Sequence, residues 1–352
     1  MAGKRKTLPE NIYEIIENKD FDIFKKTFEK CDINAYERDF IKKPVICFYS
    51  IPAEWIRWLI ENGANIEAQD YYGRTALWYH ASVNNVEKVR VLLELGADIH
   101  AADQYQDTAL HAANGKYEVT AFLIEKGADI FAKNGRNQTP LLYMLERCQS
   151  IDIANVAKSA ELLLKSGAKI SKSAKEQVVR IGENFEFHRQ NFNPEFFPET
   201  ESGLQQLYSL FKVEPVAKRN MHDGISPITV PDGDFDQQFA YLWDFLVPSV
   251  GHAKSIQGEV IRITGKIRDE ILRNGGGNWD KDFKKMLSAI LDYFTQGNSL
   301  SNTEINKAQE LKTLLYEGDD DGQDSLELAK LAILWVTQNP DVIPLEKVNY
   351  KR

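Results

Sequence analysis

Apolar residues recur at helical spacing along most of the chain, and in the first half they recur in blocks of similar length. Between Thr75 and Gly96 there are two short apolar stretches, and the second places Val89, Leu92 and Leu93 at the i, i+3, i+4 spacing of a helix with one apolar face. The same arrangement returns in the two blocks that follow. The pattern therefore predicts a repeated unit of helix, turn and second helix, with these second-helix residues in the core.

A glycine closes each block and sets the period. The glycines are Gly63, Gly96, Gly127 and Gly167, at intervals of 33, 31 and 40 residues. A recurring interval of this kind indicates that one structural unit has been copied. Glycine suits the C-terminal end of a helix because it adopts a left-handed conformation without a Cβ penalty. Thr75, Thr108 and Thr139 stand where a side-chain oxygen is expected to cap the next helix.

At these positions the sequence resembles the ankyrin repeat, over about residues 9–172. One copy matches at Asp70, Gly73, Thr75, Leu77, Ala81, Leu92, Leu93, Gly96, Ala97 and Asp98, and further copies follow within residues 103–129 and 139–168. Trp78 departs from the pattern, because the family has a histidine there. The resemblance implies an all-α fold, with an ankyrin-repeat solenoid of about five repeats in residues 1–172. The first unit is rich in Lys and Glu, as expected of a terminal repeat whose outer face has no neighbour.

The resemblance also implies a protein-binding surface, because loop tips of successive repeats line up on one face. The family's usual contact positions correspond here to Tyr71, Tyr72, Arg74, Gln104, Tyr105, Asp107, Arg136 and Gln138. Tyrosine and arginine are enriched among the residues that dominate interface energetics. The alternative is that the tyrosines pack along the layer of loop tips and only stabilise the stack.

After Ile170 the period stops. Prolines and glycines then interrupt residues 173–234, which we interpret as a connector with helices and turns, and residues 235–352 are predicted to form an α-helical domain. Its longest clean helix is predicted over 252–274, with a branched residue at every third or fourth position. Gly258 and Gly265 lie seven residues apart in this helix and are expected to let another helix approach closely.

Composition and net charge argue against several classes of function. The chain has 352 residues and a net charge of −9, which argues against a general nucleic-acid or anionic-membrane binder. No apolar run approaches the roughly 18 residues that span a bilayer, and the basic start is not followed by the apolar stretch of a secretory signal. Three cysteines without paired spacing favour a reducing cytoplasm. No cofactor or metal is predicted.

Candidate chemistry in the second half is sparse. His222, His252, Glu259 and Arg262 could converge on a pocket; otherwise Glu259–Arg262 and Asp269–Arg273 are ordinary surface ion pairs. The glycines at 275–277 lack the ending of a phosphate-binding loop and predict a turn between helices. The acidic run that contains Asp319 matches the early positions of a calcium loop, but leucine occupies the twelfth position, so we interpret it as a solvated turn.

These observations favour an intracellular protein-binding protein, such as an adaptor or an inhibitor, that uses the loop tips of its repeats. An immunity-type role, which neutralises a toxin by occluding it, follows only by analogy with bacterial ankyrin proteins. In the alternative, the C-terminal helical domain is an enzyme or a small-molecule-binding domain that the repeats direct to a target.

Overall fold

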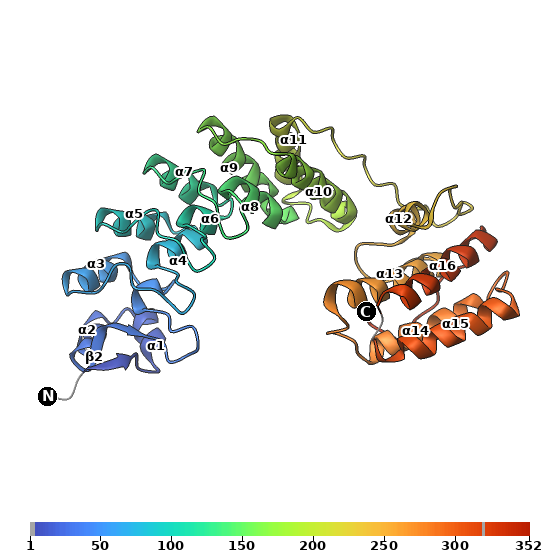
Figure 1. Cartoon of the computed structure of the whole chain (residues 1–352), viewed down its shortest axis with the longest axis horizontal. Helices are drawn as coiled ribbons and strands as arrows, with labels where there is room; N and C mark the ends of the chain where they lie inside the picture. The colour runs from blue at the N-terminus through green and yellow to red at the C-terminus, as the bar shows by residue number, and fades with distance from the viewer. Residues whose placement is uncertain (1–3, 319–320) are drawn as a thin grey trace. The chain divides into compact units, whose positions relative to one another are not determined.

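Helix follows helix along nearly the whole chain in the computed structural model, which describes residues 4–318 and 321–352 (Figure 1). The predicted all-α class is confirmed, with one small addition near the N-terminus. There, β1 (Arg5–Thr7) pairs in parallel with β2 (Cys31–Tyr36). The described residues form two compact units. The first comprises the residues up to Phe185 together with Phe192–Val216, and the second comprises Glu186–Asn191 and Ala217–Arg352.

Five helix pairs build most of the first unit. They are α1 (Ile12–Glu17) with α2 (Phe21–Lys30), the 3-10 helix η1 (Val45–Cys47) with α3 (Ala53–Glu61), α4 (Ala76–Ser82) with α5 (Val86–Glu94), α6 (Ala109–Ala113) with α7 (Tyr117–Glu125), and α8 (Pro140–Arg147) with α9 (Ile153–Lys165). In Figure 1 the second helices α3, α5, α7 and α9 form one row, and α4, α6 and α8 form the other.

The predicted ends of these helices are confirmed. All four closing glycines have positive φ angles, between 89° and 107°. The Thr75 and Thr139 side chains each accept a hydrogen bond from the backbone three residues later, and Thr108 shares a capping box with His111. The second-helix residues Val89 and Leu92 are fully buried. Stacking covers these apolar faces, which no single pair could bury alone.

A sixth helix pair extends the first unit beyond the repeats. It consists of α10 (Lys172–His188) and α11 (Phe197–Phe211), separated by the short 3-10 helix η3 (Arg189–Asn191). The last three residues of α10 and the whole of η3 belong to the second unit. Helix α11 packs on α9, and a methyl group at Gly203 would lie only 2.7 Å from the Ala154 Cα atom. Pro198 does not delay the start of α11, because proline is tolerated in the first turn of a helix.

The second unit is organised around α13 (Ile256–Asn274), which packs against three other helices. They are α12 (Phe235–Leu246), α14 (Lys281–Phe294) and α16 (Gln323–Gln338). Helix α15 (Asn302–Leu314), followed by the 3-10 helix η4 (Leu315–Glu317), packs against α14 and α16. Val260, Ile263 and Ile267 of α13 are fully buried, as their spacing predicted.

Local sequence fixes both ends of α13. It begins later than predicted, because the Ser255 side chain accepts a hydrogen bond from Gly258 N and so caps the helix. Gly275 ends it in a left-handed conformation, which confirms the predicted turn between helices. Asp319, of the calcium-loop alternative, lies outside the described residues.

The two glycines of α13 admit α12, as predicted. A methyl group at Gly265 would lie 2.1 Å from a ring carbon of Trp243, and one at Gly258 would lie 2.9 Å from the Leu246 carbonyl oxygen. Trp243 therefore lies directly on the backbone of α13, and any side chain at position 265 would displace it.

We predict that Gly265→Ala destabilises the second unit by about 1–3 kcal/mol, the usual cost of overpacking. Scanning calorimetry of the full chain measures the loss. The same substitution in a Trp243→Ala background should lose this penalty and instead gain stability, because alanine favours helix over glycine by up to about 1 kcal/mol. Equal costs in the two backgrounds would contradict the proposed contact.

Candidate functional site

Three hairpin loops between the repeats share one internal design. The residues Asp70, Asp103 and Asn134 begin them, and each of these side chains accepts two backbone hydrogen bonds, from the second and fourth residues that follow, at 2.8–3.0 Å. A backbone bond then closes each loop, such as the 3.1 Å bond from Asp70 N to Arg74 O. The tips are therefore fixed by buried polar contacts.

Backbone hydrogen bonds also link each hairpin to the next. Tyr71 N donates to Ile41 O at 2.7 Å, Gln104 N to Tyr72 O at 2.9 Å, and Gly135 N to Tyr105 O at 2.7 Å. Four consecutive loops are thus joined edge to edge, which sets the spacing of the side chains that they carry.

The linked tips carry a row of aromatic rings, which we call the aromatic ladder: Phe40, Tyr71, Tyr72 and Tyr105. Adjacent ring centroids lie 4.4, 5.4 and 6.4 Å apart along this order. Phe40, Tyr71 and Tyr105 are 63%, 55% and 51% exposed, although the rings of this row are in contact with one another. The ladder is therefore a continuous exposed aromatic strip on a fixed support.

Phe40 was missed from the sequence. It lies 32 residues before Tyr72, close to the 33 residues that separate Tyr72 from Tyr105, so the repeat period itself could have found it. Phe40 lies in the loop between the first two helix pairs, where the sequence shows no recognisable hairpin motif, so this correspondence was not apparent.

Arg74 supports the ladder from one side. Its guanidinium lies over the rings of Tyr72 and Trp78, at 5.0 and 4.4 Å from their centroids, and its Nε atom lies 3.6 Å from the buried carboxylate of Asp103. Trp78, the departure from the repeat pattern, thus serves as a platform for this arginine. Arg74 is half-buried and acts mainly within the protein.

Two predicted contact residues are corrected by the structure. Asp107 and Gln138 are buried, and the Asn134 side-chain amide donates to both of them, at 2.8 and 3.0 Å. Gln138 also donates to Glu146. Asp107 thereby links its hairpin to the next one, and Gln138 joins its own loop to α8, so we exclude both from the contact surface. Gln104 and Arg136 are exposed.

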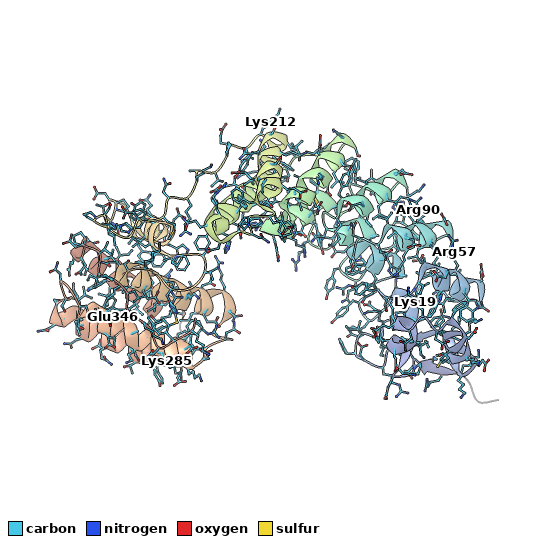
Figure 2. All side chains as sticks on the ribbon, turned by 180° about the vertical axis from the view of Figure 1, so that it is seen from behind. Lys19, Arg57, Arg90, Lys212, Lys285 and Glu346 are labelled. Carbon is cyan, nitrogen blue, oxygen red and sulfur yellow. The ribbon has the colours of Figure 1, made fainter. Side chains whose placement is uncertain are left out.

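The row of second helices differs from the hairpin side. Figure 2 labels Arg57 on α3 and Arg90 on α5, which belong to this row. Arg57 pairs with Glu94 at 2.5 Å, and the Arg90 guanidinium lies 4.4 Å from the centroid of Phe122. These two basic side chains are thus engaged in contacts between neighbouring second helices.

In the second unit, three of the four predicted pocket residues converge. The Arg262 guanidinium donates to both carboxylate oxygens of Glu259, at 2.8 and 2.6 Å, and His252 Nδ1 lies 3.1 Å from Glu259 Oε1. Tyr350 donates to the same carboxylate at 2.8 Å, and Arg262 also donates to the carbonyl of Arg352. The pair is buried, with 0% and 1% side-chain exposure, so its prediction as a surface pair was wrong.

The electrostatics of this cluster follow from its burial. Burial alone would raise the pKa of Glu259, but the hydrogen bonds and charge of Arg262, with the Ala253 N–H, outweigh it and hold that pKa below its ordinary value. Burial, Tyr293 and Glu259 together raise the pKa of Tyr350. The Glu259 oxygens are occupied by protein donors, so this cluster is a structural centre.

His222 does not join this cluster. Its Nδ1 atom accepts a hydrogen bond from Gly224 N at 2.9 Å, and its Nε2 atom lies 2.8 Å from the Ser226 carbonyl oxygen. Both ring nitrogens are therefore engaged with the backbone of their own turn. Across residues 4–318 and 321–352, His, Cys, Asp and Glu side chains form no group of three that could hold a metal ion.

Paired helices stacked in two rows, with linked hairpins between them, define an ankyrin-type solenoid. A family model described as ankyrin repeats (3 copies) matches residues 13–103 and again residues 45–134. The N-terminal region of this chain is therefore an ankyrin-repeat region, and no family model matches the C-terminal half. Ankyrin repeats generally mediate protein–protein interaction. No curated protein matches the chain.

A search of the described helices for membrane spans finds none with the length and apolar character required.

We predict that Glu259→Gln destabilises the second unit by about 3–5 kcal/mol, because it leaves the Arg262 charge buried without its partner. The matched control is Asp269→Asn, which breaks the exposed Asp269–Arg273 pair on the same helix and should cost at most about 0.5 kcal/mol. Unfolding of each full-length variant by scanning calorimetry provides the comparison, and similar losses for the two variants would contradict the assignment.

Acid should weaken the second unit through the same residue. Because folding lowers the pKa of Glu259, its ionised form stabilises the folded state above the ordinary value of 4.5, and this contribution is lost as pH falls through the lower folded-state value. Unfolding free energy measured between pH 6 and pH 3 should therefore fall less steeply for Glu259→Gln than for the wild type. Parallel curves for the two proteins would rule out this linkage.

Proposed function

We propose that this protein binds a partner protein through the aromatic ladder of its hairpin tips. The observation that carries the proposal is the continuous exposure of Phe40, Tyr71 and Tyr105 on loops linked by backbone hydrogen bonds. Exposed aromatic strips of this kind mark interaction surfaces, because burying rings supplies large contact area.

The support beneath the ladder favours affinity. Tyrosine has few rotatable bonds, so fixing it in a complex costs little conformational entropy. The loops are already held by paired Asp and Asn contacts and by links between hairpins. A partner therefore meets a surface close to its bound geometry, which reduces the ordering cost of association.

Charge suggests the chemistry of the partner. Lys42 and Arg136 are exposed at opposite ends of the ladder, whereas the hairpin acids Asp70, Asp103 and Asp107 are buried. Asp39, the exposed acid beside Phe40, accepts a hydrogen bond from Lys42 N. We infer a partner surface with apolar side chains in the middle and acidic side chains towards the edges.

An adaptor or inhibitor role fits this surface, and an immunity-type protein that occludes a toxin is one form of it. We place the protein in a reducing cytoplasm. Its three cysteines are free and buried, and burial raises the pKa of the Cys148 thiol to about 12, which suppresses the reactive thiolate. The thiols are therefore suited to packing within the repeats.

Site-specific cross-linking tests the surface directly. A photoreactive phenylalanine analogue at position 105 should cross-link a partner in extracts of the native cell. The same analogue at Tyr117, an exposed aromatic position on second helix α7, should not. Cross-links of equal yield at both positions would contradict a partner site on the hairpin side.

The affinity of the captured partner then measures the contribution of the ladder. Phe40→Ala, Tyr71→Ala and Tyr105→Ala together should weaken binding at least 100-fold, since an aromatic hot-spot residue contributes about 2 kcal/mol or more. Tyr72 is kept because it packs under Arg74. Tyr117→Ala is the control and should bind like the wild type; a triple variant of unchanged affinity would falsify the proposal.

A further inference from the structure

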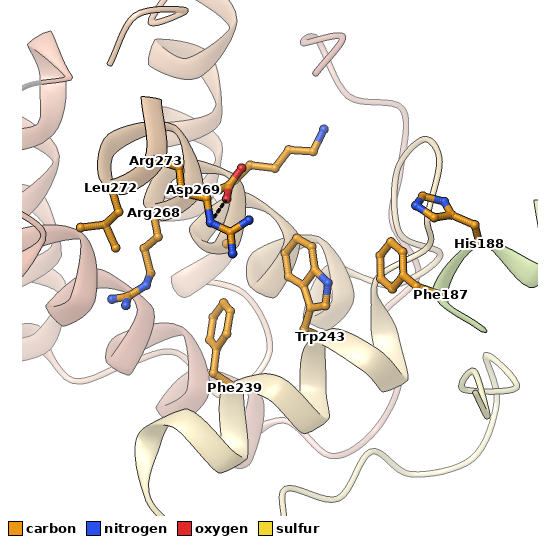
Figure 3. A pocket seen from close by; sticks show the side chains of 10 residues that line it. Phe187, His188, Phe239, Trp243, Arg268, Asp269, Leu272 and Arg273 are labelled. Carbon is orange, nitrogen blue, oxygen red and sulfur yellow. Dashed lines mark ion pairs between the residues drawn. The ribbon is translucent and has the colours of Figure 1, made fainter. Parts of the chain in front are cut away.

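A cavity of about 710 Å³ opens in the second unit, between α12, α13 and the segment that follows Glu186 (Figure 3). This volume lies in the range of pockets that hold small organic ligands. The cavity is separate from the Glu259–Arg262 cluster, and neither of these residues lines it.

One wall of the cavity is aromatic. Phe239 and Trp243 lie one turn apart on α12, with ring centroids 6.3 Å apart, and the Phe187 ring lies nearly parallel to Trp243 at 6.4 Å. All three rings are half-buried, so each keeps part of its surface open. Figure 3 shows Phe239 and Trp243 projecting from their helix toward the cavity.

This wall is held in place by specific contacts. The Trp243 ring packs directly on the backbone of α13 at Gly265, because any side chain at that position would overlap the ring. Arg219 donates to the carbonyl oxygens of Phe187 and Trp243, both at 3.1 Å, and its guanidinium lies 4.2 Å from the Phe187 ring centroid. The aromatic surface is therefore formed before any ligand arrives.

Helix α13 supplies a basic wall. Lys266, Arg268 and Arg273 line the cavity, with Asp269 as the single acid, and Asp269 pairs with Arg273 at 3.2 Å. Arg268 Nη1 is buried and has no hydrogen-bond partner in the structure described here. Protein atoms cover this nitrogen, so Arg268 contributes its positive charge to the cavity and not this donor. The local excess of positive charge contrasts with the net charge of −9 for the chain.

We propose that this cavity binds a small anion that carries a planar aromatic ring, such as an aromatic phosphate or a nucleoside phosphate. The ring packs against Trp243 and Phe239, and the anionic group is attracted by the positive charges of Lys266, Arg268 and Arg273 on α13. Both halves of the site are needed, because stacking selects flat rings without regard to charge and the basic wall selects anions without regard to shape.

The state of Lys266 supports this assignment. Burial, and then the positive charge of Arg262, lower the pKa of Lys266, and the negative charge of Glu259 offsets only part of this effect. An anion beside the ammonium group would offset that repulsion, as any opposite charge within a few ångströms favours the charged form.

Calorimetric titration of the full chain with 1-naphthyl phosphate tests the site. Its dissociation constant should be below about 1 mM, given typical affinity per atom for small ligands. The uncharged ring, 1-naphthol, and inorganic phosphate alone should each bind at least tenfold more weakly. AMP and adenosine form a second pair that differs only in the phosphate. Tighter binding of AMP than of 1-naphthyl phosphate would identify a nucleotide as the preferred ligand.

Variants locate the binding. Arg268→Gln and Lys266→Gln should each weaken 1-naphthyl phosphate about five- to tenfold and reduce its advantage over 1-naphthol. Lys281→Gln removes an equal charge from exposed α14, outside the cavity, and should leave affinity unchanged. Melting curves show that each variant is folded. Failure of 1-naphthyl phosphate to bind up to 5 mM, or equal affinity in the Lys266→Gln, Arg268→Gln double variant, overturns the proposal.

Discussion

The chain of backbone hydrogen bonds between successive hairpins is the constraint on which the first unit's surface depends. Helix pairs stack because none can bury its apolar face alone, but stacking by itself leaves the loop tips free to differ in height and direction. The bonds from Tyr71, Gln104 and Gly135 to the preceding hairpins remove that freedom. The Asp and Asn contacts inside each loop make this possible, since they present the donors and acceptors at one edge. As a result, the exposed aromatic rings on successive hairpins form one continuous strip.

Much of this architecture could be predicted from sequence, because it depends on interactions between residues that are close together in the chain. Glycines that adopt positive φ, threonines that cap helices and apolar residues at helical spacing all act within a few residues of themselves. The burial of Asp107 could not be predicted in this way, because it depends on Asn134 of the neighbouring hairpin, and the burial of Gln138 depends on Asn134 of its own loop and on Glu146 of α8. Phe40 fits the repeat period, but the loop that contains it lacks the hairpin motif of the later repeats. The sequence thus predicts the units better than it predicts the contacts between them.

The same limit explains the error in the second unit. Periodicity placed Glu259 and Arg262 on the polar side of α13, and a lone helix would expose that side. The helix is instead covered on several sides, and residues near Tyr350, some ninety positions away in sequence, close over the pair. A spacing rule carries no information about such distant coverage. His252 joins the cluster from the loop before α13, only seven residues from Glu259, whereas His222 satisfies both nitrogens in its own turn.

Both units keep aromatic rings partly exposed, and each provides a rigid support for them. Linked hairpins hold Tyr71 and Tyr105, while Gly265 and Arg219 hold Trp243 and Phe187. An aromatic ring that is free to move would collapse onto nearby apolar surface or lose entropy on binding. A ring held in place avoids both. The devices differ because the geometry differs: hairpin tips are joined through their own backbone groups, whereas α12 approaches α13 through a position that has no side chain. In the first unit the ladder residues are thus held through their own backbone groups, whereas in the second unit other residues, Gly265 and Arg219, hold the rings in position.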